Sequence, residues 1–312
     1  MITSIFGKSR PLNYILLSVA VALSYVAYII LSKETSLDFR NILQHTALIG
    51  IIIFSLFVVN FIAKKNNITR DNSYVFLFYL CFLLFFPGIF LQPKLIISSF
   101  FILLATRRLM SLHSLIAVKE KIFDASLWIF VAALFHFWSI LFVVLVFVSI
   151  IFHASSDYRN WILPFISFFT VLILFTSFSL VFDKTLLTSF FDKINFDIVF
   201  KLPVEAIQKL SLMVFTAFAI YLFVMLLLSY QKKPLILHHA YKKVIFLFLI
   251  GILVYLVSPQ ISNEMLVFTF FPLAIMATSF VETTSDKWSG EIMSGLLILF
   301  AVLFYIGSIR VL

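Results

Sequence analysis

Long apolar stretches separated by short polar intervals recur along this whole chain. Most of them are long enough to cross a bilayer as a helix, which takes about 20 residues. The predicted spans are residues 12–32, 45–63, 74–91, 95–106, 126–153, 160–182, 210–230, 243–258, 265–281 and 292–309. This pattern predicts an all-α fold, a polytopic transmembrane bundle of about 10–11 membrane helices. The polar intervals are far shorter than a domain, so residues 1–312 are expected to form a single integral membrane domain.

Composition supports the same class. Of the 312 residues, 63% are hydrophobic and 12% are charged, whereas soluble domains are about 45–50% apolar and about 25% charged. The low charge and high hydrophobicity also exclude a disordered chain. Cys81 is the single cysteine, so an internal disulfide is excluded.

The basic residues indicate how the chain is oriented. The net charge is +9, from 23 Lys and Arg against 14 Asp and Glu. In a membrane protein such an excess marks cytoplasmic loops, so the expected partner is the lipid bilayer and no nucleic acid is expected. The cations collect in four regions, residues 8–10, 64–71, 107–121 and 231–243. We expect these regions and the N-terminus to be cytoplasmic, in a bacterial inner membrane.

This orientation requires an odd number of crossings between residues 124 and 209, where two apolar stretches lie. The stretch 126–153 has 28 residues, about 42 Å as one helix, against a hydrocarbon core of about 30 Å. One solution is a hairpin of two short helices that breaks near His136 or Trp138, and we favour it. The other is a stretch that re-enters without crossing. The side on which the C-terminus lies stays open.

Two polar intervals have their own pattern. Residues 183–209 interleave apolar and charged side chains, which predicts an external amphipathic segment on the membrane surface. Residues 107–124 form a basic segment on the cytoplasmic side. There we expect Arg107 and Arg108 to contact anionic lipid headgroups.

The motifs of common enzyme classes are missing from the sequence. It has no Gly-rich phosphate loop and no zinc-protease or serine-hydrolase motif. No acidic residue lies deep in a predicted span, which disfavours an ion-coupled transporter. No two histidines stand three or four residues apart, so no metal and no cofactor are expected. His136 is an intramembrane polar residue, either functional or a structural histidine at a helix break.

The first external loop offers candidate chemistry. Glu34 and Asp38 follow the first span, and a carboxylate there is a candidate catalytic base toward a sugar or lipid hydroxyl. Arg40, and Lys94 on the next external turn, are candidate contacts for a lipid-linked phosphate. The alternative interpretation of this loop is a solvated turn.

This acidic loop, the short Phe- and Leu-rich spans and the stretch Ala133-Leu134-Phe135-His136-Phe137-Trp138-Ser139 resemble integral-membrane glycosyltransferases and polysaccharide polymerases. The resemblance covers about residues 30–150 and implies a lipid-linked sugar as substrate and an acidic base in the first loop. This chain departs from that group in lacking its usual large external domain and a clear Asp-Glu signature. As a whole it is similar to polytopic membrane proteins of about this size in Bacteroidota, which implies a fold and a compartment but no activity.

Three functions stay open at this point. The first is an envelope enzyme that transfers or polymerises a polyprenyl-linked glycan at the outer face, which a polar external cavity would favour. The second is a non-catalytic subunit or scaffold of a membrane complex, which a wide exposed apolar flank would favour. The third is a transporter or flippase, which a central cavity reachable from both faces would favour.

Overall fold

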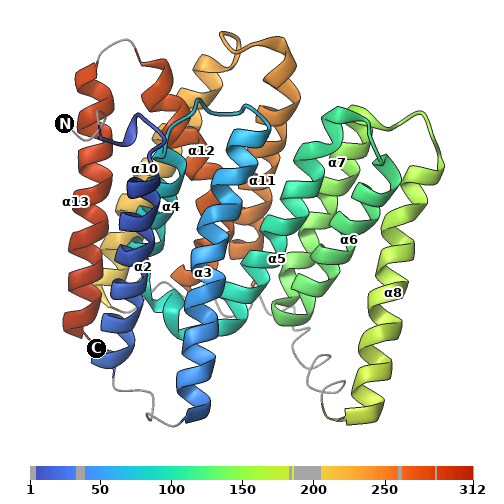
Figure 1. Cartoon of the computed structure of the whole chain (residues 1–312), viewed down its shortest axis with the longest axis horizontal. Helices are drawn as coiled ribbons and strands as arrows, with labels where there is room; N and C mark the ends of the chain where they lie inside the picture. The colour runs from blue at the N-terminus through green and yellow to red at the C-terminus, as the bar shows by residue number, and fades with distance from the viewer. Residues whose placement is uncertain are drawn as a thin grey trace.

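A computed structural model describes residues 5–32, 39–182, 185, 205–258, 262–284 and 287–311. These residues form an all-α bundle (Figure 1), which confirms the predicted fold class. Eight helical segments of the described chain are long and apolar enough to cross a membrane, and two apolar helices are shorter. The α-helices are α2 (Pro11–Ser32), α3 (Phe39–Lys65), α4 (Tyr74–Phe85), α5 (Pro93–Met110), α6 (Val118–Phe135), α7 (Val143–His153), α8 (Arg159–Phe182), α10 (Ala206–Tyr230), α11 (His238–Val257), α12 (Val267–Thr283) and α13 (Lys287–Val311).

Two helices, α4 and α12, form the centre of the bundle. Nearly every residue of α4 is buried, and 83% of the span that contains α12 is buried. The Phe82 ring of α4 stacks on the Phe270 ring of α12 with 6.2 Å between centroids. A helix of α4's length extends about 18 Å, less than the hydrocarbon core. A helix that is too short to cross the bilayer is stable inside the membrane because the surrounding helices shield its ends from lipid.

The chain breaks at His136, as the length of residues 126–153 predicted. There α6 ends at Phe135, a 3₁₀ turn η3 (Phe137–Phe142) follows, and α7 begins at Val143. Lys119, near the start of α6, forms an ion pair of 3.2 Å with Asp157, which follows α7. The chain therefore returns to the end from which it came, and α6 and α7 form the predicted hairpin (Figure 1).

The structure describes the predicted polar interval 107–124 in full but only part of the interval 183–209. Most of residues 107–124 are helical, because they comprise the last turn of α5, a 3₁₀ turn η2 (Ser111–Ser114) and the first turns of α6. An ion pair of 2.9 Å between Arg108 and Asp124 joins α5 to α6 there. Most of residues 183–209 lie outside the described chain, and the part from Ala206 belongs to α10.

The four basic regions meet at one end of the bundle, which we call the basic end. Lys64 Nζ lies 2.5 Å from Ser9 Oγ and 2.6 Å from Asp71 Oδ1. Lys243, on α11, is buried and donates to the Leu109 carbonyl of α5 at 2.7 Å. The N-terminus lies at the basic end and the C-terminus at the opposite end (Figure 1).

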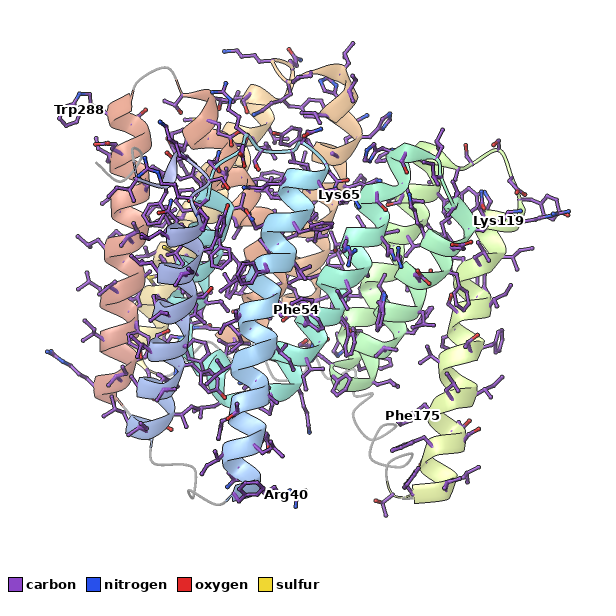
Figure 2. All side chains as sticks on the ribbon, in the orientation of Figure 1. Arg40, Phe54, Lys65, Lys119, Phe175 and Trp288 are labelled. Atoms are coloured by element: carbon purple, nitrogen blue, oxygen red, sulfur yellow. The ribbon has the colours of Figure 1, made fainter. Side chains whose placement is uncertain are left out.

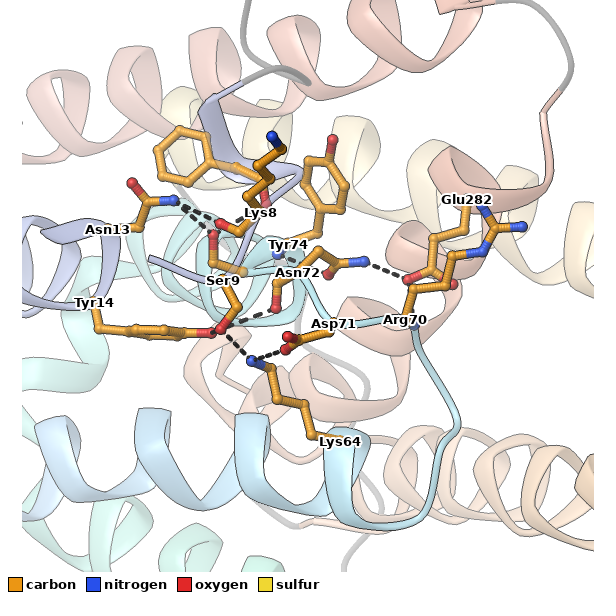
Figure 3. A network of polar contacts seen from close by, with 12 residues as sticks. Lys8, Ser9, Asn13, Tyr14, Lys64, Arg70, Asp71, Asn72, Tyr74 and Glu282 are labelled. Carbon is orange, nitrogen blue, oxygen red and sulfur yellow. Dashed lines mark hydrogen bonds and ion pairs between the residues drawn. The ribbon is translucent and has the colours of Figure 1, made fainter. Parts of the chain in front are cut away.

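A network of hydrogen bonds holds the basic end together (Figure 3). The Glu282 carboxylate of α12 accepts from the Arg70 backbone N–H at 2.8 Å and from Asn72 Nδ2 at 2.5 Å. Asn13 of α2 donates to Ser73 Oγ at 3.2 Å. The hydrogen bond from the Lys64 ammonium lowers the pKa of Asp71. The loop between α3 and α4 is thus bonded to α2 on one side and α12 on the other.

Candidate functional site

At the end opposite the basic end, two interruptions of the central helices enclose a polar cavity. The 3₁₀ turn η1 (Pro87–Leu91) follows α4, and the 3₁₀ turn η5 (Asn263–Leu266) precedes α12. The first turns of α10 and single residues of α2 and α13 complete the wall. This polar pocket has a volume of about 80 Å³ and is lined by Tyr28, Phe85, Phe86, Pro87, Gly88, Glu205, Gln208, Ser211, Asn263, Glu264 and Ser308.

Local sequence explains how η1 forms and what it leaves open. Pro87 stands at the first position of η1, and a proline ring cannot continue a regular helix such as α4. Gly88 follows it, and a Cβ atom at Gly88 would overlap the Glu264 carboxylate. The missing side chain at Gly88 therefore provides the space in which the Glu264 carboxylate lies.

The polar pocket presents oxygen acceptors. Asn263 is 4% exposed, and its Nδ2 donates to the Gln208 carbonyl at 2.9 Å. Its Oδ1 is buried and has no hydrogen-bond partner among the described residues. Nor does any Lys or Arg of the described chain pair with the Glu205 or Glu264 carboxylate. A buried acceptor without a partner is costly, so a ligand that donates hydrogen bonds, such as a sugar hydroxyl, suits this pocket.

The residues predicted from the first external loop stand apart from the pocket. Glu34 and Asp38 lie outside the described residues, between α2 and α3. Arg40 is exposed in the first turn of α3, at the end opposite the basic end (Figure 2). Lys94 is exposed in the first turn of α5. Neither cation lines the polar pocket, and among the residues that the structure describes its lining contains no Lys or Arg.

His136 lies at the helix break and not in the pocket lining. Its Nε2 is 3.3 Å from Ser258 Oγ, and its ring stacks on Phe268 with 5.6 Å between centroids. Its carbonyl accepts from Ser139 Oγ at 2.7 Å. The contacts with Ser258 and Phe268 join the α6–α7 hairpin to α11 and α12.

We therefore expect His136→Ala to lower stability rather than to alter a site. The loss of the hydrogen bond and of ring packing should cost about 1–3 kcal/mol, seen as a lower midpoint of thermal unfolding in detergent. His239→Ala is the matched control, because His239 is exposed at the basic end and contacts only the Phe152 and His153 rings among the described aromatic side chains, so it should lower the midpoint less than His136→Ala. An unchanged midpoint for His136→Ala, combined with loss of cellular function, would contradict this expectation.

The two neighbouring arginines at the end of α5 have different surroundings. Arg108 forms the ion pair with Asp124. The Arg107 guanidinium lies over the Phe61 ring of α3, 4.8 Å from the centroid. Contact of either side chain with a lipid headgroup stays a prediction.

Sequence reasoning missed Glu205, Asn263 and Glu264. Glu264 directly precedes the predicted span 265–281, and Glu205 lies within the interval interpreted as a surface segment. One signal was present, because Pro87-Gly88 interrupts the predicted span 74–91. A proline and a glycine inside an apolar stretch indicate a break, and in membrane proteins irregular backbone lies where protein or a cavity covers it.

Comparison of this chain with protein-family models, with curated proteins and with solved structures finds no match. The helices themselves show a multi-pass membrane protein in contact with the lipid bilayer.

Proposed function

We propose that this protein is a cell-envelope enzyme of the bacterial inner membrane that transfers or polymerises a polyprenyl-linked sugar at the outer face. The observation that carries the proposal is the polar pocket, with two carboxylates and an Asn263 Oδ1 that has no hydrogen-bond partner in the described part of the chain. Cations collect on the cytoplasmic side of membrane proteins, so the basic end is assigned to the cytoplasm. The polar pocket then opens toward the outside, where lipid-linked sugars are extended.

In this proposal Glu264 is the general base. Its carboxylate removes the proton from the acceptor hydroxyl as that oxygen attacks the sugar carbon, and the lipid phosphate leaves. Asn263 Oδ1 accepts from a second hydroxyl and orients the sugar. A volume of about 80 Å³ admits a hydroxyl-bearing edge of a sugar ring, so the rest of the glycan extends beyond the opening.

The donor phosphate requires cations, and the described residues of the pocket lining include none. Arg40 and Lys94 remain the candidates, because both start helices at the same end of the bundle. The segment with Glu34 and Asp38 begins soon after Tyr28, which lines the pocket. Glu34 and Asp38 lie outside the described residues, so a role for either as catalytic base stays a prediction.

A second candidate is a scaffold subunit, which α8 favours. Only 17% of the α8 span is buried, and its exposed side chains include Phe165, Leu174 and Val181. A transporter is less favoured, because α4 and α12 fill the middle of the bundle with fully buried aromatic rings such as Phe82 and Phe270.

Glu264→Gln tests the enzyme proposal. The amide keeps the shape of the side chain but cannot accept the proton, so turnover should fall by about 10²–10⁴-fold while protein level stays normal. The measurements are complementation of a deletion strain and mass spectrometry of lipids extracted from the purified variant. We expect an intact polyprenyl-linked sugar to accumulate on Glu264→Gln relative to the wild type.

Further variants sharpen this experiment. Gly88→Ala should reduce function as well, because the added methyl displaces the Glu264 carboxylate. Glu120→Gln is the control, since Glu120 is exposed at the start of α6, at the basic end. Full function in Glu264→Gln, Glu205→Gln, Glu34→Gln and Asp38→Asn would refute the enzyme. A stoichiometric protein partner that purifies with bulk phospholipid alone would favour the scaffold.

A further inference from the structure

A second cavity lies on the outside of α3, near the basic end and away from the polar pocket. It has a volume of about 620 Å³, and all but one of its lining residues belong to α3. Phe54, Phe57 and Phe61 form its apolar wall, and Lys64, Lys65 and Arg107 stand at its end. Figure 2 shows Phe54 partway along α3 and Lys65 at the end of that helix. We call this cavity the α3 groove.

The length of the α3 groove matches one leaflet of a bilayer. Phe54 and Lys65 are separated by eleven residues of helix, which extend about 16 Å. Half of the hydrocarbon core is about 15 Å. The spacing of Phe54, Phe57 and Phe61 places the three rings on one face of α3, and each ring is at least 40% exposed. An acyl chain lying along this face would reach from the basic end to the bilayer centre.

The end of the α3 groove carries uncompensated positive charge. Lys64 is paired with Asp71. By contrast, no carboxylate in the described part of the chain pairs with Lys65 or Arg107. Both cations lie over the Phe61 ring, Lys65 Nζ at 5.1 Å and Arg107 Cζ at 4.8 Å from its centroid. Their contacts with one ring place both cations at the same end of the α3 groove, at the level where a lipid phosphate begins.

We propose that the α3 groove binds an anionic phospholipid, with its phosphate between Lys65 and Arg107 and one acyl chain along Phe61, Phe57 and Phe54. Charge complementarity selects the headgroup, since two unpaired cations attract an anionic lipid near the membrane surface. The exposed phenyl rings provide apolar contact along the tail. This inference is independent of the proposed enzymatic function, because it concerns other residues, at the basic end.

The test is a titration of the full chain in mild detergent with phosphatidylglycerol or phosphatidylcholine, with bound lipid counted by native mass spectrometry. We expect phosphatidylglycerol to bind on the order of tenfold more tightly than phosphatidylcholine. The double variant Lys65→Gln/Arg107→Gln should lose this preference. Both side chains are exposed, so the variant should fold, and its unfolding midpoint without added lipid checks this.

A matched control removes the same charge from the same end. Lys232 and Lys242 are exposed, and Lys242 also lies over an aromatic ring, that of Phe152 at 5.6 Å, but neither lines the α3 groove. The double variant Lys232→Gln/Lys242→Gln should therefore keep the preference for phosphatidylglycerol. Equal binding of both lipids to the wild type, or equal losses in the two double variants, would overturn the proposal. Displacement of phosphatidylglycerol by a lower concentration of a polyprenyl phosphate would also overturn it, since the α3 groove would then hold a substrate-type lipid.

Discussion

Gly251→Ala is expected to lower the free energy of unfolding by about 1–3 kcal/mol. Gly251 lies in α11 where that helix crosses α12. A Cβ atom there would lie 2.8 Å from Thr269 Cγ2 and 3.2 Å from the backbone carbon and oxygen of Phe268. Backbone atoms cannot rotate away as a flexible side chain does, so the two helices must separate. The measurement is the midpoint of thermal unfolding in detergent, followed by tryptophan fluorescence.

Gly50→Ala is the matched control for Gly251→Ala. Gly50 lies in α3, and a Cβ atom there would meet nothing within 4 Å. Alanine has the higher helix propensity, by about 1 kcal/mol, so Gly50→Ala should leave the midpoint unchanged or raise it. A wild-type midpoint for Gly251→Ala would show that α11 and α12 are not in close contact at this point. An equal decrease in both variants would mean that glycine itself, rather than packing, matters.

Glu282→Ala is expected to destabilise the protein by about 2–4 kcal/mol. It removes the acceptor of two hydrogen bonds, from the Arg70 backbone N–H and from Asn72 Nδ2. Asn72 is 3% exposed, so its amide group loses a partner without gaining water. The same carboxylate joins α12 to the loop between α3 and α4, and its loss should loosen the basic end. Chemical or thermal unfolding of the purified variant measures this effect.

Glu282→Gln separates hydrogen bonding from charge. Glutamine keeps one carbonyl acceptor, so Glu282→Gln should lower the free energy of unfolding less than Glu282→Ala does. Glu120→Ala removes an exposed carboxylate from the first turn of α6 and should cost less than about 1 kcal/mol, the value of its interaction with the helix dipole. Equal stability of Glu282→Ala and Glu120→Ala would contradict a structural role for Glu282.

The positions of most helices followed from sequence alone, although their ends did not. The predicted span 45–63 corresponds to α3, which extends from Phe39 to Lys65. Hydropathy identifies the part of a helix in the hydrocarbon core, whereas polar ends such as Arg40 continue the helix beyond it. The break at His136 was predictable because the stretch 126–153 is too long for one crossing and the charges on either side require an odd number.

The residues that form the candidate site could not be predicted from the sequence. Candidate carboxylates were named at the end opposite the basic loops, in the first external loop, whereas the polar pocket at that end contains Glu205 and Glu264. The carboxylates chosen from sequence, Glu34 and Asp38, were chosen because they stand in a loop. Glu264 adjoins an apolar span, so its position in the chain gives no indication that it lies against Gly88.

The membrane class, the approximate spans, the hairpin and the shared location of the cations follow from the order of residues alone. These features depend on local quantities, namely the length of an apolar stretch and the charges beside it. Which helices are central and which polar residues share a cavity depends instead on contacts between segments far apart in the chain. The α8 span has a higher mean hydropathy than the span that contains α12, yet 17% of it is buried against 83% for the span with α12. Lipid and protein interior are equally apolar, so hydropathy cannot distinguish them, and packing between distant segments decides.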